Sequence, residues 1–421
     1  MSSLEFAIGR LNAFLAEVQR LDECEFPYEH SQVALHRIRD LFDNKLALLQ
    51  SFDSKSDPAI VKQQCTLSLS ALFDYVPLLG FILRSTNVRN AFEVFGPLLR
   101  LARDLLEPGV DKSKCQTRLV LSSEWDYSPF VYGEIPDLPG FVLIGLPAPE
   151  SSNPLLIPLA GHELGHAVWQ KADYHTAITP CIKTHMLDVI RSRWKEFQAA
   201  LPSPKGAPVA LADLTTNMFC VQFWQQCVPW ALRQAEESYC DFVGIRIFGE
   251  SYLHAFAYIL SPSTEGERSL VYPNMRKRVS NLLDAASSYG VPVPPHYLDM
   301  FDDLANPNLI QSNAFLLSVA DSVLDKMKAD LIDRAVADVN ASSLKLPSQS
   351  ESDRIFCRFL YVVPAENCKS LADILNAGWR AHFQSDLWDG IPHVRRHRER
   401  NLKELVLKNF EVYEIEQILK G

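Results

Sequence analysis

The sequence predicts an α+β fold that is mostly helical, with a small antiparallel sheet and helical flanking regions. Apolar residues recur at helical intervals through residues 1–107, as Leu4, Ile8 and Leu11 illustrate. Short runs rich in β-forming residues follow between residues 117 and 146, separated by Pro, Gly and Asp. From about residue 155 the helical pattern returns and continues to residue 419 with few breaks.

Three regions are expected along the chain: an N-terminal helical region over 1–110, a central region over 111–290 and a C-terminal helical region over 291–421. Within the first region, the apolar spacing predicts helices at 59–75 and 92–106. We find no residues with evident chemistry in this part. It is expected to be a packing layer or a partner-binding module.

Three strands are predicted in the central region, at 118–121, 130–132 and 141–146. They lead directly into an apolar helical run at 155–169. An edge strand in this position could pair with an extended peptide through main-chain hydrogen bonds. We therefore expect the sheet to border a substrate cleft.

The remaining chain predicts helices at 178–201 and 230–248, further helices through 251–340, and another at 371–383. The segment 393–400 is basic and begins a last helix. A solvated helix start explains such a run more simply than a nucleic-acid patch.

Composition narrows the function classes. The formal net charge is −10, so no nucleic-acid partner is expected. The N-terminus lacks the pattern of a signal peptide, and the apolar stretch nearest to a membrane span, at 75–83, is too short and contains Pro77 and Gly80. The nine cysteines form no C-x-x-C pair, which favours reduced core thiols and a cytoplasmic location.

The pattern His162-Glu163-Leu164-Gly165-His166 reads H-E-x-x-H and lies within the apolar run. Residues four apart share one face of a helix, so both imidazoles can face one cation. Glu163 lies beside them, where it can act as the general base toward water. The alternative is a core helix with two incidental histidines. Histidine is scarce, at 11 of 421 residues, and burying these groups without partners is costly.

A catalytic zinc usually has three protein ligands. The metzincin continuation is excluded, because Trp169 and Ala172 occupy its Gly and His positions. Glu237 is the better third ligand, since Asp241 follows four residues later and could accept a hydrogen bond from His162. Glu236 is the rival ligand, and an exposed acidic patch is the alternative to a site. Gly244 could let this helix approach the first one closely.

With these residues the chain resembles the gluzincin metallopeptidases, whose pattern is H-E-x-x-H followed by a helix carrying E-x-x-x-D. A later segment, residues 271–279, is similar to the T-H-P-P-x-x-x-R-[IV] segment of the prenyl-protein endopeptidase-like group. The resemblance covers roughly residues 140–285 and implies a zincin-like core. It implies that Tyr272 replaces the family's oxyanion-stabilising His and that Arg278 supports the site or pairs with Asp241. The membrane spans of that group are not expected here.

These features predict a zinc-dependent peptidase with one Zn²⁺ per chain, acting on a peptide or protein substrate. His162, His166 and Glu237 would bind the metal, Glu163 would be the general base, and Tyr272 would stabilise the oxyanion. The alternative is a catalytically silent scaffold or a regulatory protein, which does not need Glu163. A third, weaker alternative is nucleic-acid association through the basic segment. The sequence leaves substrate specificity and oligomeric state open.

Overall fold

The structure is a computed structural model, and it describes residues 3–89, 91–125, 130–131, 135, 137–201, 209–261, 267–303 and 309–420. It contains two compact units. Unit 1 comprises Met1–Ala102 and Asp111–Pro154, and unit 2 comprises Arg103–Val110 and Leu155–Gly421. This division differs from the three regions expected from the sequence. The sheet groups with the N-terminal helices, and the C-terminal helices group with the H-E-x-x-H helix.

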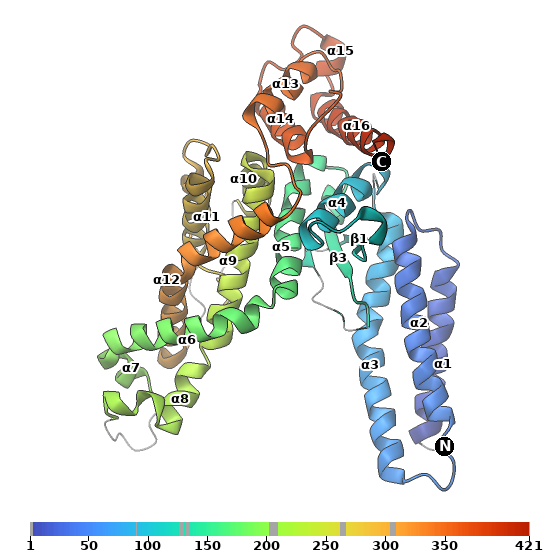
Figure 1. Ribbon diagram of the computed structural model, residues 1–421, viewed down its shortest axis with the longest axis vertical. Helices are drawn as coiled ribbons and strands as arrows, with labels where there is room; N and C mark the ends of the chain where they lie inside the picture. Colours follow the sequence, from blue (N-terminus) through green and yellow to red (C-terminus); the bar gives the residue numbers. More distant parts are fainter. Residues whose placement is uncertain are drawn as a thin grey trace. The chain divides into compact units, whose positions relative to one another are not determined.

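Unit 1 is built on three long helices whose apolar faces meet in one core (Figure 1). These are α1 (Ser3–Asp22), α2 (Glu29–Gln50) and α3 (Pro58–Arg84), and α4 (Ala91–Leu106) follows them. The start of α3 follows the chemistry of its first residues. The Asp57 carboxylate accepts a hydrogen bond from the backbone N–H of Ala59 at 2.8 Å, and Pro58 occupies the first turn.

The sheet of unit 1 has the strand order β1-β3-β2, with β1 at Arg118–Glu124, β2 at Phe130–Val131 and β3 at Phe141–Pro147. The strand positions match the sequence prediction over the described residues, which do not include residue 132, but the antiparallel arrangement is wrong for the main pair. β1 and β3 run parallel, and only the short β2 pairs antiparallel. Both long strands are buried on nearly every residue. β3 is apolar throughout and β1 is apolar at residues 119–121, and such near-continuous burial is typical of parallel strands.

Side chains from the start of α2 cover the outer edge of β1. The Tyr28 hydroxyl donates to the carbonyl oxygen of Leu121 at 2.6 Å and accepts from its N–H at 2.8 Å. The backbone N–H of Leu119 donates to His30 Nδ1 at 3.1 Å. Main-chain groups that would otherwise be open to another strand are thereby occupied.

Helix α3 meets the length and composition expected of a membrane span. The segment Pro58–Asn87 has a mean hydropathy of 1.7, with 39% of its apolar window buried. A core helix of a soluble protein can meet the same criteria, so this finding is weak evidence. That the chain has no membrane span remains a prediction.

Unit 2 is helical across its described residues. Its α-helices are α5 (Ala160–Lys171), α6 (Tyr174–Ser192), α7 (Trp194–Ala200), α8 (Met218–Gln225), α9 (Val228–Phe248), α10 (Glu250–Leu260), α11 (Met275–Tyr289), α12 (Gln311–Ala341), α13 (Gln349–Phe359), α14 (Leu371–Phe383), α15 (Pro392–Arg395) and α16 (Arg398–Leu419). The predicted helix at 178–201 is divided at Arg193 into α6 and α7.

Helix α9 is the central element of unit 2. It packs against α5 and α12, with α6, α10, α11 and α14 also in contact (Figure 1). Most of its residues are buried on all sides, including Glu236, Glu237 and Asp241. A helix buried all round normally carries apolar residues. The three carboxylates must therefore have partners on neighbouring helices.

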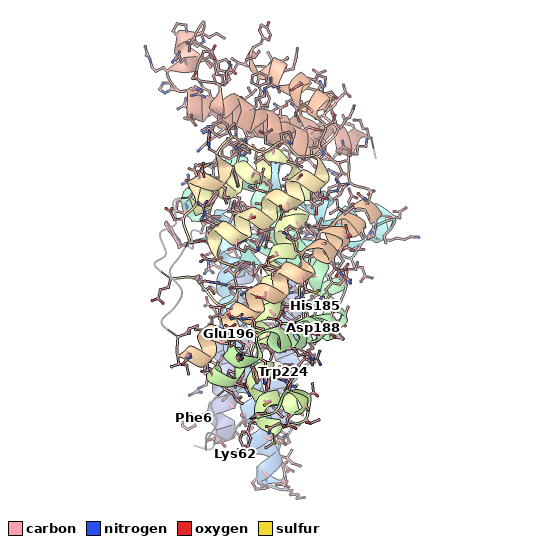
Figure 2. The ribbon with its side chains drawn as sticks, turned by 90° about the vertical axis from the view of Figure 1, so that its left-hand side faces the viewer. Phe6, Lys62, His185, Asp188, Glu196 and Trp224 are labelled. Carbon is pink, nitrogen blue, oxygen red and sulfur yellow. The ribbon has the colours of Figure 1, made fainter. Side chains whose placement is uncertain are left out.

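Figure 2 shows α6, α7 and α8 of the same unit, with Asp188 and Glu196 labelled among their side chains. Asp188 accepts a hydrogen bond from Arg191 at 2.9 Å, and Glu196 accepts one from Arg193. Asp188, Arg191 and Glu196 are about half exposed. Such exposed pairs contribute little to stability, so these acidic residues are suitable reference positions for substitutions.

Candidate metal centre

Helices α5 and α9 carry the candidate centre between them. His162, Glu163 and His166 lie on α5, and each is at most 8% exposed. Glu237 and Asp241 lie on α9, and each is 1% exposed. The structure thus brings the two sequence motifs together inside unit 2, although 70 residues separate them in the chain.

Glycines set the distance between these helices. A Cβ atom on Gly165 would lie 2.7 Å from the Cα atom of Cys240, and one on Gly161 would lie 3.0 Å from the Cα atom of Gly244. The first distance is shorter than real contacts allow and the second is unusually tight, so a larger residue at Gly165 would force the helices apart. The two helices are therefore close where Gly161 faces Gly244, but the space left by the missing side chain of Gly244 is filled by the Tyr252 ring of α10.

His162 contacts two carboxylates through its two ring nitrogens. Its Nδ1 atom lies 2.9 Å from Asp241 Oδ1, and its Nε2 atom lies 3.2 Å from Glu237 Oε2. Asp241 therefore occupies the position predicted for it, where it accepts a hydrogen bond when Nδ1 carries the proton. This contact fixes the ring orientation and directs Nε2 toward Glu237.

His166 has the same arrangement with a different carboxylate. Its Nδ1 atom lies 2.9 Å from Glu236 Oε1, and its Nε2 atom lies 3.8 Å from Glu237 Oε2. The two Nε2 atoms and one Glu237 oxygen therefore face a common point. Tetrahedral zinc with bonds of about 2.0–2.2 Å separates its ligand atoms by roughly 3.4 Å, which fits this donor set.

His162, His166 and Cys240 also form a buried cluster that could hold a metal ion, with one potential ligand atom from each within 4.8 Å of the others. Glu237 Oε2, at 3.2 and 3.8 Å from the two Nε2 atoms, is the other candidate for the third ligand. Burial and the neighbouring carboxylates also raise the pKa of the Cys240 thiol well above its usual value. The sequence had suggested only a packing role for Cys240.

Asp241 joins the histidine to a buried cation. The Arg278 guanidinium donates to Asp241 through Nε at 2.7 Å and through Nη2 at 2.9 Å. The Tyr252 hydroxyl donates to the same carboxylate at 2.8 Å. Burial alone would raise the pKa of Asp241, but Arg278 and His162 outweigh it and hold that pKa below its usual value. Asp241 is therefore an ionised carboxylate with several strong hydrogen bonds.

The pKa values of His162 and Glu237 are also shifted by the charged groups of the centre. Burial would lower the pKa of His162, but the hydrogen bonds to Asp241 and Glu237 outweigh this effect and raise it to about 10. Burial would raise the pKa of Glu237, but the contact with His162 holds it below its usual value. Glu237 is therefore deprotonated, which is the form in which a carboxylate can bind a metal.

Glu163 differs from the other carboxylates of the centre. It is 5% exposed, and its carboxylate has no hydrogen bond or ion pair within the described part of the chain. Burial raises its pKa, and the charges of His162 and His166 only partly oppose this. A buried carboxylate without a partner is costly and is therefore commonly functional.

Tyr272 lies next to the Asp241–Arg278 pair. The Arg278 guanidinium is 4.7 Å from the centre of the Tyr272 ring. Arg268 donates to the Tyr272 carbonyl oxygen at 3.0 Å and pairs with Asp321, which anchors this segment to α12. Burial raises the pKa of the Tyr272 phenol, which keeps it a neutral hydrogen-bond donor.

Sequence reasoning missed three contributors to the centre. Glu236 appeared only as a rival metal ligand, yet it contacts Nδ1 of His166. Arg233 contacts both Glu236 and Glu237. Arg233 precedes them by three and four residues, and this spacing could have predicted both ion pairs on a helix. Tyr252 gave no signal, because it reaches Asp241 only through the turn between α9 and α10 at Gly249, whose φ is +63°.

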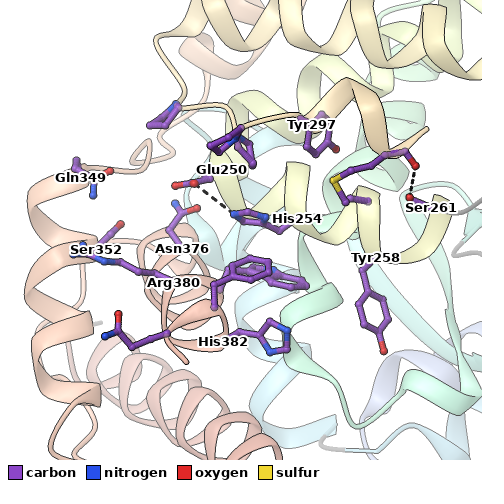
Figure 3. A pocket seen from close by; sticks show the side chains of 18 of the residues that line it. Glu250, His254, Tyr258, Ser261, Tyr297, Gln349, Ser352, Asn376, Arg380 and His382 are labelled. Carbon is purple, nitrogen blue, oxygen red and sulfur yellow. Dashed lines mark hydrogen bonds and ion pairs between the residues drawn. The ribbon is translucent and has the colours of Figure 1, made fainter. Parts of the chain in front are cut away.

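A separate cavity of about 1210 Å³ lies in unit 2 between α10, α13, α14 and the proline-rich segment before α12 (Figure 3). The structure describes all seven predicted site residues, and none of them lines this cavity. His254 and Tyr258 of α10 line this cavity, whereas Tyr252 of the same helix contacts Asp241. Helix α10 thus contributes to both features.

No family model, curated protein or solved structure matches this chain. The resemblance to gluzincins therefore depends on the motif residues and their geometry.

Proposed function

We propose that the chain is a zinc-dependent peptidase of gluzincin type that holds one Zn²⁺ through His162, His166 and Glu237. The main support is the orientation of the two histidines. Each has its Nδ1 atom against a carboxylate, while both Nε2 atoms face Glu237 Oε2. Metal-binding histidines nearly always hold their second nitrogen in this way, and a core without a metal does not require it.

Bound zinc would supply Lewis acidity, which activates water and polarises the substrate carbonyl. The chain's own groups would move the protons. Glu163 is buried beside the ligands with a raised pKa, so it can take the proton of the attacking water and deliver it to the leaving amine. Tyr272 would donate a hydrogen bond to the developing oxyanion.

Asp241 would act through His162. It would accept a hydrogen bond from Nδ1–H, and it accepts hydrogen bonds from Arg278 and Tyr252. This keeps Nε2 free as the donor atom and makes the imidazole more basic. The buried Arg278 balances the Asp241 charge, which would otherwise be costly in this position.

The test compares zinc content and hydrolysis of a set of fluorogenic peptides and an unfolded protein substrate. Glu163→Gln should keep about one zinc per chain and lose nearly all activity, because an amide cannot act as the base. Glu196→Gln on the exposed α7 is the matched control and should behave as wild type. Full activity in Glu163→Gln would rule out the mechanism.

The second candidate is a catalytically silent scaffold or regulatory protein. One observation favours it: both ring nitrogens of His162 have carboxylate partners within the chain itself. Glu163 favours the peptidase, since a scaffold has no use for a buried, unpartnered carboxylate. Zinc binding without hydrolysis of any peptide, and without an effect of Glu163→Gln on any measured property, would favour the scaffold.

A further inference from the structure

The second histidine of the centre has a hydrogen-bond partner that the motif does not specify. His166 Nδ1 lies 2.9 Å from Glu236 Oε1, and both side chains are about nine-tenths buried. Glu236 directly precedes Glu237 on α9, so the two side chains leave the helix about 100° apart. Both can therefore face α5, but they reach different atoms of the two histidines.

Arg233 joins these two carboxylates. Its Nη1 atom donates to Glu236 Oε2 at 2.7 Å, and its Nη2 atom donates to Glu237 Oε1 at 3.1 Å. The opposite oxygen of each carboxylate faces a histidine, Glu236 Oε1 toward His166 and Glu237 Oε2 toward both Nε2 atoms. The Arg233 guanidinium thus hydrogen-bonds Glu236 Oε2 and Glu237 Oε1. The other oxygen of each carboxylate, Glu236 Oε1 and Glu237 Oε2, faces the histidines.

We propose that Arg233 positions the metal centre by holding Glu236 against His166 and by making Glu237 a one-oxygen ligand. This inference rests on the proposed zinc site. An arginine hydrogen bond to the second oxygen of a carboxylate favours metal binding through the first oxygen. A one-oxygen Glu237 with two histidines leaves a coordination position open for water, which catalysis needs.

The contact differs from an ordinary surface ion pair. The Arg233 side chain is 46% exposed, but those of Glu236 and Glu237 are 9% and 2% exposed. Exposed pairs contribute little because water screens both partners. Here the anionic partners are largely shielded, and the fork of Arg233 spans two of them. A lysine ammonium is a point charge and cannot reproduce that geometry.

The test measures zinc affinity by competition with a chromophoric chelator and the visible spectrum of the Co²⁺-substituted protein. In Arg233→Met, Glu237 can bind through both oxygens, so the cobalt absorption should weaken as the coordination number rises. Zinc affinity should fall by about 10- to 100-fold. Glu236→Ala should lose affinity by a similar factor but keep the wild-type cobalt spectrum, because Arg233 still holds Glu237.

Arg191→Met on α6 is the matched control, because Arg191 has similar exposure and pairs only with Asp188 among the described residues. Arg233→Lys keeps the positive charge and should reduce zinc affinity by less than Arg233→Met does. This variant keeps the test possible if Arg233→Met folds poorly. Unchanged affinity and an unchanged cobalt spectrum in both Arg233 variants would overturn this inference alone. A wild-type protein that binds neither zinc nor cobalt would overturn the proposed function as well.

Discussion

Replacing Asp241 with Asn should destabilise the protein even when no metal is present. The Asp241 carboxylate is 1% exposed and accepts hydrogen bonds from Arg278 at 2.7 and 2.9 Å. The amide keeps nearly the same shape but removes the negative charge, so the buried Arg278 loses its counter-ion. Breaking a buried pair from one side costs about 3–5 kcal/mol. We expect the free energy of unfolding to fall by that amount.

Urea unfolding in the presence of a chelator separates this effect from metal binding. Arg278→Leu should cost a similar amount, because it leaves Asp241 unpaired, and the double variant should cost clearly less than the sum. Asp188→Asn is the control, since its arginine pair is exposed and should change stability little. A loss below about 1 kcal/mol in Asp241→Asn, or strict additivity in the double variant, would refute the reasoning.

Further variants test other parts of the account. Gly165→Ala should destabilise the protein by about 1–3 kcal/mol, because the new methyl group would overlap the backbone at Cys240. Gly9→Ala in α1 meets no atom within 4 Å and should stabilise by up to about 1 kcal/mol; equal effects would contradict the close-approach argument. Tyr272→Phe should keep zinc and reduce turnover by about 10²- to 10³-fold, and undiminished turnover would remove its assigned role. With a thiol reagent, the exposed Cys181 should react in the native protein, whereas Cys240 should react only after unfolding.

The sequence predicted helix positions well where apolar residues were regularly spaced and where capping residues marked the helix ends. The predicted helix at 371–383 coincides with α14, whose start is capped by the Ser370 side chain, and the one at 230–248 corresponds to α9. The predicted helix at 59–75 was too short. Pro77 lies inside α3 without ending it, because tertiary contacts hold the helix to Arg84.

The sheet shows where local pattern reasoning reached its limit. Short apolar runs such as 119–121 and 142–144 identify strands, but pairing direction depends on what covers the two faces. Helices α2 and α3, which lie well before β1 in the sequence, pack against it. The same reasoning could not show that the sheet belongs with the N-terminal helices and not with the α5–α9 pair.

Within the candidate centre, the structure brings together the residues chosen by spacing, whereas the contacts set by packing were not foreseen. The i, i+4 spacing of Glu237 and Asp241 was sufficient to put the second residue against His162. The contact between Glu236 and His166 depends on the rotation of α9 against α5, which the glycine contacts set. Tyr252 depends on the turn at Gly249, which no residue spacing encodes.

The most direct test of the central claim is the zinc content of the purified protein beside Glu237→Ala and Cys240→Ala. The account predicts about one zinc per wild-type chain, retention in Cys240→Ala and loss in Glu237→Ala. This result would establish the His162, His166 and Glu237 ligand set. Zinc retained in Glu237→Ala but lost in Cys240→Ala would contradict the account and assign the site to the His162–His166–Cys240 cluster.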